Sequence, residues 1–507
     1  MPSKIYSATT FGLESQLIEV EADLIGEAAK FNIVGLPDTA VQEAKERVRS
    51  AIKNSDFAFP RQKITVNLAP ADLKKIGPIF DLPIALSILL TKKCLELPVK
   101  ERQSVFIGEL ALDGTLRPIN GALSIATLLK TSNLNKLYLP EKNAPEANLI
   151  STLKIFPVKN LLQLIKHLKG KEQITPLPPS DFKIDFKERQ PLSFQNIKGQ
   201  LQAKRALEIA AAGNHNLFMI GPPGSGKTLL ARSLPELLPS LSLEEALEVT
   251  KIYSVSGLVL PHQPLITERP FRSPHHTASG VSLVGGGSFP KPGEITLAHR
   301  GVLFLDELPE FPRTALENLR QPLEDGVITI ARASHTLQFP ARFTLIAAAN
   351  PCPCGYLTDS EKECKCSPGQ ILKYQKRISG PLLDRFDLQI EVPRVKFIDL
   401  NTKNSATETQ NIIQRIALAR KIQRQRFKDN DLVNTFTNSE ITSQNIEQLC
   451  PLDEPSKQLL KEAMSKFHLS ARSYHRLIKV ARTIADLAQA ENIKIEHLAE
   501  ALQFRMP

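Results

Sequence analysis

The chain is long and basic, and it has no apolar segment of membrane-spanning length. Its 507 residues include 64 Lys and Arg against 53 Asp and Glu, for a formal net charge of +11. These values are typical of a globular protein of about two to four domains, and the charge suits a polyanionic partner such as nucleic acid. The longest apolar run, residues 82–90, is too short to cross a bilayer, and the N-terminus has no signal-like run. We therefore expect a cytoplasmic protein that does not enter a membrane.

Residues 1–170 form the first block of the sequence. Strand-like runs at 63–68 and 104–110 alternate there with amphipathic helical stretches at 40–54 and 82–91. The alternation predicts a domain that mixes strands and helices.

Three further segments follow this block. Prolines and a charged run interrupt the periodicity over 171–191, which predicts a linker. Strands and helices alternate again over 192–395, which predicts an α/β domain with a doubly wound, mostly parallel sheet. Residues 396–507 are more polar and have helical spacing, which predicts a C-terminal helical lid.

The most specific motif is the sequence GPPGSGKT in the segment 192–395, between a strand-like run and a helix start. Its glycines allow backbone N–H groups to point at phosphate oxygens, and the following helix adds its positive N-terminal end. Lys227 would reach the β- and γ-phosphates of ATP, and the Thr228 hydroxyl would hold Mg²⁺. The residues expected to bind the nucleotide are Gly221, Pro222, Pro223, Gly224, Ser225, Gly226, Lys227 and Thr228.

A second motif is a pair of acids that follows the apolar run 302–305. Asp306 would lie near the Mg²⁺ held by Thr228, and Glu307 would polarise an attacking water. Two adjacent acids at the end of a strand can also form a solvated turn. Downstream of a phosphate loop, the hydrolytic interpretation is favoured.

Two polar segments lie between these motifs. The segment RSPHHTASG contains His275 and His276, which could be metal ligands, although a loop or interface role fits their setting better. Further on, Lys291 follows the glycines 285–287 and could lie near the tip of a loop that contacts DNA.

Four of the six cysteines lie close together after the second motif, at Cys352, Cys354, Cys364 and Cys366. In a reducing compartment, such thiols are more typical of a metal site than of disulfides, and four thiolates could hold a structural Zn²⁺. The pairs have CxC spacing instead of the commoner CxxC spacing. Reduced thiols without metal therefore remain the alternative.

Three further segments carry a family resemblance: FTLIAAAN ends at Asn350, GPLLDRFDL contains Arg385 and LSARSYHRL contains Arg472. With the two nucleotide motifs they resemble the AAA+ ATPases, in the branch of the Mg-chelatase ATPase subunit and the minichromosome maintenance helicases. The resemblance implies that Asn350 orients the attacking water and that Arg385 is an arginine finger for the neighbouring subunit's nucleotide. It implies that Arg472, or Arg476 as the alternative, is the second sensor of the lid. A finger acting on a neighbour implies a ring, and the family implies a homohexamer.

The segment EDGVITIARASHTLQFPARF, just before the Asn350 strand, resembles a β-hairpin inserted in this family. In the helicases the equivalent hairpin enters the ring channel, which implies that Arg332 and His335 contact single-stranded or branched DNA. A cationic tip with small neighbours suits phosphate contact that is independent of sequence. The alternative is an exposed hairpin with a solvated arginine.

The first block contains VEADL, FNIVGLPDTAVQEAKERVRSAIKNS and FIGELALDGTLRPINGA, which resemble the Lon-protease-like domain with the ribosomal protein S5 fold. A protease of that type needs a serine within the step at 77–80 and a lysine near 120–123, and this chain has neither. We therefore expect no peptidase activity. The basic residues of this block that could instead contact DNA are Arg47, Arg49, Lys74 and Lys75.

By these motifs together, the chain is identified as a member of the ComM/YifB family of Mg-chelatase-like AAA+ ATPases. Membership implies a hexameric motor that uses ATP and Mg²⁺ to drive branch migration of DNA during natural transformation and homologous recombination, with recombination proteins as further partners. Two alternatives stay open: a Mg-chelatase-type subunit that drives metal insertion into a porphyrin, and a protein-remodelling ATPase.

Overall fold

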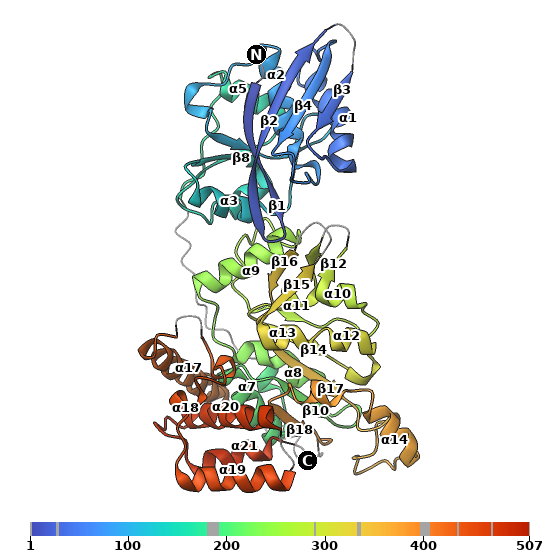
Figure 1. The fold of residues 1–507 in the computed structure, drawn as a ribbon, viewed down its shortest axis with the longest axis vertical. Coiled ribbons are helices and arrows are strands. Elements are labelled where there is room, and N and C mark those ends of the chain that lie inside the picture. The colour runs from blue at the N-terminus through green and yellow to red at the C-terminus, as the bar shows by residue number, and fades with distance from the viewer. Residues whose placement is uncertain are drawn as a thin grey trace. The chain divides into compact units, whose positions relative to one another are not determined.

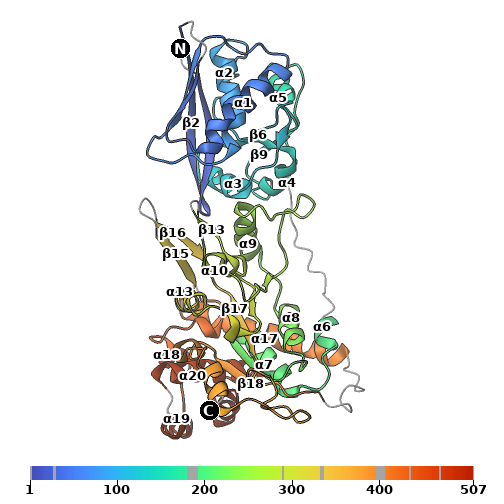
Figure 2. The same ribbon diagram turned by 90° about the vertical axis from the view of Figure 1, so that its right-hand side faces the viewer.

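The computed structural model forms two compact units (Figure 1, Figure 2). Unit 1 consists of Met1–Asp185 with Leu243–Thr267, and unit 2 consists of Phe186–Ser242 with Glu268–Pro507. The described residues are 3–26, 30–179, 192–287, 290–331, 336–395, 406–432, 435–467 and 470–505. Every helix among them is too short or too polar to span a bilayer.

The described strands of unit 1 form a seven-stranded sheet in the order β3-β4-β2-β1-β5-β8-β9. Its strands are β1 (Ser3–Phe11), β2 (Glu14–Ile25), β3 (Phe31–Val34), β4 (Lys63–Ala69), β5 (Ser104–Phe106), β8 (Lys136–Pro140) and β9 (Lys154–Val158). β1 and β2 form an antiparallel hairpin, whereas β5, β8 and β9 run parallel. Every second residue of β4 is buried, so one face of this strand packs on the core.

Helices cover the sheet of unit 1 because each presents apolar residues to it. They are α1 (Thr39–Asn54), α2 (Asp81–Thr91), α3 (Ala122–Thr131), α4 (Ala144–Ala147) and α5 (Leu161–Leu168), with short elements η1 (Pro78–Phe80), η2 (Val99–Glu101), η3 (Glu141–Asn143), β6 (Glu109–Leu110) and β7 (Leu116–Arg117). α1 begins where the Asp38 side chain accepts from the Val41 N–H at 2.8 Å. α2 is apolar on nearly all sides and is almost completely buried, as expected of a central helix.

Residues 243–267 lie in unit 1, which differs from the sequence prediction. We expected them in the block 192–395. Instead, α9 (Leu243–Val255) packs beside α3, and Leu247 contacts the core of unit 1. The Gly121 N–H donates to the Ser254 carbonyl at 3.0 Å. These contacts join residues far apart in the sequence, so local periodicity could not predict them.

The predicted linker begins later than expected. Residues 171–179 belong to unit 1, where Ile174 is buried and the Leu177 N–H donates to the Ile155 carbonyl at 2.9 Å. The remainder of the predicted linker, 180–191, lies outside the described residues.

The described part of unit 2 contains a five-stranded parallel sheet in the order β11-β14-β17-β10-β18. Its strands are β10 (Leu217–Ile220), β11 (Phe271–Arg272), β14 (Val302–Leu305), β17 (Thr344–Ala349) and β18 (Leu388–Glu391). Helices α7 (Leu201–Gly213) and α8 (Lys227–Leu237) pack against it. This arrangement confirms the predicted α/β fold with a parallel sheet.

Helices near the C-terminus pack on the same core as this sheet. They are α17 (Ala406–Asp429), α18 (Ile446–Leu449), α19 (Glu454–Phe467), α20 (Ala471–Leu487) and α21 (Ile495–Gln503), with η5 (Asn438–Glu440). α20 buries residues such as Leu477, Ala481 and Ile484 and packs against α7 and α17. The helices of the predicted lid therefore belong to unit 2 and do not form a separate compact body.

Shorter elements complete the described part of unit 2: α6 (Leu192–Gln195), α10 (Gly280–Val284), β12 (Gly285–Gly286), β13 (Lys291–Pro292), α11 (Glu294–Leu297), η4 (Leu308–Glu310), α12 (Arg313–Glu317), α13 (Arg320–Asp325), β15 (Val327–Ala331), β16 (Thr336–Pro340), α14 (Pro368–Gln375) and α15 (Gly380–Leu383). β15 and β16 pair as an antiparallel hairpin, with Val327 opposite Pro340. The inserted hairpin is thus present just before β17.

Two of the basic residues considered as DNA contacts, Arg47 and Lys75, bind partners inside unit 1. The Arg47 guanidinium binds both carboxylate oxygens of Asp81, at 2.7 and 3.1 Å, and the Asp81 side chain is fully buried. Lys75 is also fully buried, and its ammonium donates to the carbonyls of Pro70 and Leu73. Burial of these charges with their partners corrects the interpretation of Arg47 and Lys75 as DNA-contacting residues.

Arg47→Met should lower the free energy of unfolding of unit 1 by about 3–5 kcal/mol, because it leaves the buried Asp81 carboxylate without its partner. Urea denaturation of the full chain, with hydrogen exchange of α1 and α2 as the local readout, measures the loss. Arg49→Met is the matched control, since Arg49 on the same helix is exposed and its guanidinium carbon lies 5.8 Å from the Phe59 ring centre. Equal losses for both variants would contradict the assigned role of Arg47.

Candidate functional site

The loop Gly221–Gly226 connects β10 to α8 and requires glycine for two different reasons. Gly224 and Gly226 have φ of +78° and +90°, conformations that L side chains rarely adopt. Gly221 instead lies against the neighbouring strand, where a Cβ would come within 2.2 Å of the Val392 carbonyl oxygen. The curled loop therefore requires glycine at these three positions.

Lys227, the first residue of α8, lies inside the curve of the loop. Its Nζ donates to the carbonyls of Gly221 at 2.7 Å and Pro222 at 2.9 Å. Burial lowers the pKa of Lys227, and the charges of Asp306 and Glu307 oppose that shift. The ammonium thus meets neutral carbonyl oxygens, and charged phosphate oxygens would be stronger partners.

Ser225 supplies a further polar group inside the loop. Its Oγ is buried and finds no hydrogen-bond partner among the described residues. The loop therefore holds an unsatisfied hydroxyl beside a buried ammonium, which fits the binding of a phosphate group.

Thr228 and Asp306 provide oxygen ligands for a cation. The Thr228 hydroxyl donates to Asp306 Oδ2 at 2.9 Å, and Asp306 Oδ1 accepts from the Glu307 N–H at 3.0 Å. Mg²⁺ prefers oxygen ligands, usually one or two carboxylates with substrate phosphates and waters. The pair fits a Mg²⁺ bound together with a nucleotide.

Asn350 lies between the loop and the acidic pair because of the strand order. β17 is hydrogen-bonded to β10 on one side and to β14 on the other. Asn350 follows β17, and its Oδ1 lies 3.4 Å from the Lys227 Nζ. The structure therefore brings together Lys227, Thr228, Asp306 and Asn350.

Glu307 has a neighbour that the sequence analysis did not assign to this site. Its Oε2 lies 3.3 Å from Nδ1 of His276, whose ring lies against that of His275 with centres 4.0 Å apart and the ring planes tilted by 34°. Among the described residues, neither histidine belongs to a group of three possible metal ligands. The polar segment RSPHHTASG was the available signal, but its distance in sequence from Glu307 concealed the contact.

Arg385 and Arg472 share one carboxylate partner. Both guanidinium groups donate to Oε1 of Glu324 on α13. Arg385 also donates to the Pro381 carbonyl at 2.6 Å and is 6% exposed. Among the described residues, no hydrogen bond or ion pair joins either arginine to the loop or to the acidic pair. Sequence reasoning did not identify Glu324.

Arg476, the alternative sensor, is engaged with a buried carboxylate. It donates to Asp387 Oδ1 at 2.7 Å and to the Arg385 carbonyl at 2.6 Å. Burial would raise the pKa of Asp387, but the charge of Arg476, with help from His215, holds it well below its usual range. This structural role of Arg476 favours Arg472 as the sensor.

The predicted DNA-contacting residues are only partly described. Arg332 and His335 lie at the turn of the β15–β16 hairpin, outside the described residues. Lys291 is exposed on β13, which pairs with the glycine strand β12. The assignment of these three residues stays a prediction.

The four clustered cysteines come together in space. Their sulfur atoms all lie within 4.8 Å of one another, and those of Cys352, Cys354 and Cys364 are separated by 3.3, 3.6 and 3.6 Å. All are free thiols. Four thiolates at a Zn–S distance of about 2.3 Å would have sulfurs about 3.8 Å apart in a tetrahedron. The donor set and its spacing therefore fit Zn²⁺.

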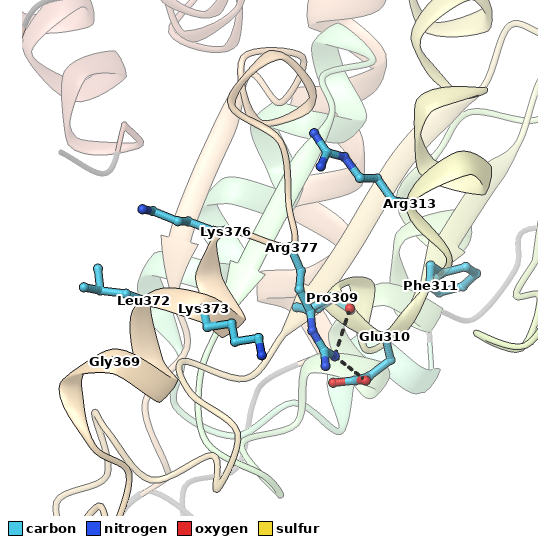
Figure 3. A pocket seen from close by; sticks show the side chains of 9 residues that line it. All are labelled: Pro309, Glu310, Phe311, Arg313, Gly369, Leu372, Lys373, Lys376 and Arg377. Atoms are coloured by element: carbon cyan, nitrogen blue, oxygen red, sulfur yellow. Dashed lines mark hydrogen bonds and ion pairs between the residues drawn. The ribbon is translucent and has the colours of Figure 1, made fainter.

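A cavity of about 850 Å³ opens beside the end of β14, between η4 and α14 (Figure 3). It is lined by Pro309, Glu310, Phe311, Arg313, Gly369, Leu372, Lys373, Lys376 and Arg377. Arg377 points toward Glu310 and binds it at 2.7 Å (Figure 3). Basic side chains outnumber acidic ones here, so the cavity carries net positive charge. The sequence analysis did not single out these residues.

Comparison with known proteins places the chain in a family. Residues 193–400 match the family model described as magnesium chelatase, subunit ChlI, residues 20–143 match subunit ChlI of Mg-chelatase, and residues 406–505 match the magnesium chelatase subunit ChlI C-terminal model. Together these matches extend over most of the sequence.

Individual relatives match over the full length. Competence protein ComM of Haemophilus influenzae is 44% identical over 505 residues, covering 99% of this chain and 97% of that protein. The uncharacterized protein YifB of Escherichia coli is 42% identical, with the same coverage of each chain. Lon protease 2 of Bacillus subtilis is 30% identical over 189 residues, or 32% of this chain and 33% of that protein. The chain belongs to the ComM/YifB family of Mg-chelatase-like AAA+ proteins, as its motifs predicted.

His276→Ala should lower kcat for ATP hydrolysis about tenfold and leave nucleotide affinity unchanged, because it removes a contact of Glu307 and none of the loop. Steady-state hydrolysis and binding of a fluorescent ADP analogue separate the two effects. His276→Asn, which keeps a hydrogen-bond donor, should recover part of kcat, and the exposed His262→Ala is the control. Reduced affinity with unchanged kcat would exclude this positioning role.

Proposed function

We propose that the chain is a cytoplasmic, homohexameric, ATP-dependent DNA motor that drives branch migration during natural transformation and homologous recombination. The observation that carries the proposal is the meeting of Lys227, Thr228, Asp306 and Asn350 around one phosphate loop. The full-length similarity to a protein named for competence supports the biological setting. Recombination proteins are the further partners that this setting suggests.

The geometry supports specific roles in ATP hydrolysis. The loop N–H groups and Lys227 bind the β- and γ-phosphates, and Thr228 and Asp306 hold Mg²⁺. When bound, Mg²⁺ neutralises charge on the phosphate oxygens. Glu307 polarises the attacking water, and Asn350, fixed at the end of the central strand β17, orients it.

Arg385 and Arg472 complete the site from the neighbouring subunit. Arginine is suited to this role because it is planar and permanently charged. In the isolated chain both arginines bind Glu324, so each must exchange this carboxylate for phosphate oxygens when a neighbour binds ATP. Because both guanidinium groups lie at one carboxylate, we place Arg472 on the same side of the subunit interface as Arg385.

DNA would pass through the ring channel as single-stranded or branched substrate. Arg332 and His335 at the hairpin turn, and Lys291 on β13, are the proposed contacts with its backbone. Phosphate contacts of this kind are independent of base sequence, as a motor that moves along DNA requires. Unit 1 is proposed to have no peptidase activity, since the step where a serine would be expected contains the buried Ile79 and Phe80.

Zinc is the proposed structural ion of Cys352, Cys354, Cys364 and Cys366. The support is the tetrahedral fit of the sulfur separations and the absence of disulfides among these thiols.

A second candidate function is a Mg-chelatase-type subunit that drives metal insertion into a porphyrin. The observation that favours it is that the three matched family models are described as parts of magnesium chelatase. The DNA motor is favoured over it because the relatives that cover the whole chain include a competence protein.

On a branched DNA substrate, the wild-type chain should displace strands in the presence of ATP and Mg²⁺. Lys227→Ala should lose both strand displacement and ATP hydrolysis because it lacks the phosphate-binding ammonium. Glu307→Gln should hydrolyse ATP about 10²–10⁴-fold more slowly while still binding it, because only the base is removed. Gel assays of strand displacement, with hydrolysis measured in parallel, test all three proteins.

Arg232→Ala serves as the control, since Arg232 is an exposed residue of α8 outside the loop. Failure of the wild-type chain to move branches would contradict the motor function. Stimulation of hydrolysis by unfolded protein and not by DNA would favour a protein-remodelling ATPase instead.

A further inference from the structure

The cysteine loop, residues 351–367, packs against the nucleotide site at several points. We propose that it is a metal-dependent clamp: Zn²⁺ held by its four thiolates fixes the phosphate loop and Asn350 in the geometry that binds and hydrolyses ATP. The inference rests on the proposed ATPase function and adds a role for the metal in that same site.

The first contact joins the cysteine loop to the phosphate loop. Gly355 lies so close to Pro223 that a Cβ on Gly355 would come within 2.6 Å of the proline Cδ and 3.8 Å of Asn350 Cγ. The Gly355 N–H donates to the Cys352 carbonyl at 3.0 Å. The turn that connects the cysteines is therefore also the surface on which Pro223 rests.

The second connection runs along the backbone itself. β17 continues through Asn350 directly to Cys352, whose side chain is fully buried. A metal bond at Cys352 would restrain the chain only two residues from the side chain that meets Lys227. A displacement of about 1 Å at such a position is enough to reduce a rate by about 10²-fold.

The third contact joins the end of the cysteine loop to η4, the short helix that follows the acidic pair. α14 begins at Pro368, and its N-cap Ser367, directly after Cys366, forms a capping box with Gln370. The Gln375 side chain at its other end donates to the Pro351 carbonyl at 3.4 Å. Arg377 then binds Glu310, three residues beyond Glu307 (Figure 3).

The tip of the cysteine loop is also anchored. Arg394, which follows β18, binds Asp359 at 2.8 Å and Glu361 at 3.1 Å. β18 is the neighbour of β10, the strand that leads into the phosphate loop. The loop is thus tied to elements on both sides of the nucleotide site, and four thiolates around one ion would cross-link its two halves.

Zinc removal from the full-length protein tests the inference. Elemental analysis should find about one zinc per chain, and a chelator under reducing conditions should remove it. Binding of a fluorescent ADP analogue should then weaken about tenfold, hydrolysis should fall further, and added Zn²⁺ should restore both. Cys364→Ser should behave as the chelated protein, whereas Cys94→Ser in unit 1 should behave as wild type.

A glycine pair tests the contact without removing a ligand. Gly355→Ala should keep its zinc yet weaken ADP binding about tenfold, because the new Cβ meets Pro223 and φ at this position is +83°. Gly369→Ala is the matched control, since a Cβ at Gly369 on the neighbouring helix α14 meets nothing within 4 Å. Thermal unfolding of both variants shows that they are folded.

The outcomes separate the clamp from the ATPase function on which it rests. A wild-type protein without zinc, or one whose ADP binding and hydrolysis survive zinc removal, overturns the clamp and leaves the ATPase function intact. Unchanged nucleotide binding in Gly355→Ala also overturns it. A zinc-loaded wild-type protein that neither binds nor hydrolyses ATP overturns the proposed function itself.

Discussion

The nucleotide site depends on one geometric constraint, which is that adjacent parallel strands end at the same edge of a sheet. β17 lies between β10 and β14, so the phosphate loop, Asn350 and the acidic pair all follow strands that end together. The contacts of Lys227 with Asn350 and of Thr228 with Asp306 are direct results of that order. An ammonium, a hydroxyl and a carboxylate from distant parts of the sequence therefore surround the space where phosphate and Mg²⁺ would bind.

Sequence reasoning succeeded where the physical requirement is local. The phosphate loop could be recognised because the positive φ of Gly224 and Gly226 and the following lysine all lie within a few residues. It failed where a side chain's role depends on a distant partner. Arg47 has the same charge whether solvated or bound to a buried Asp81, and nothing near His276 or Arg385 in the sequence points to Glu307 or Glu324. The docking of α9 on unit 1 was missed for the same reason.

The assigned roles divide the proposed active site between two subunits. One half, the loop with its acidic pair and Asn350, is assembled in the single chain and is braced by the cysteine loop through Gly355. The other half, Arg385 and Arg472, is held together on Glu324 at the end of α13, and β15 of the inserted hairpin begins just after this helix. The hairpin proposed to contact DNA therefore follows directly on the helix that carries the shared partner of both arginines.

The central claim is that each hydrolytic site is shared by neighbouring subunits, and mixing two inactive variants measures it most directly. Lys227→Ala lacks the loop half of the site and Arg385→Ala lacks the arginine half. Mixed rings contain interfaces that join the intact loop of one variant to the intact arginine of the other. The account predicts that ATP hydrolysis returns on mixing these two variants and does not return on mixing Lys227→Ala with Glu307→Gln, which damage the same half. Mixtures of Lys227→Ala and Arg385→Ala that remain inactive, although the subunits co-assemble, would contradict it.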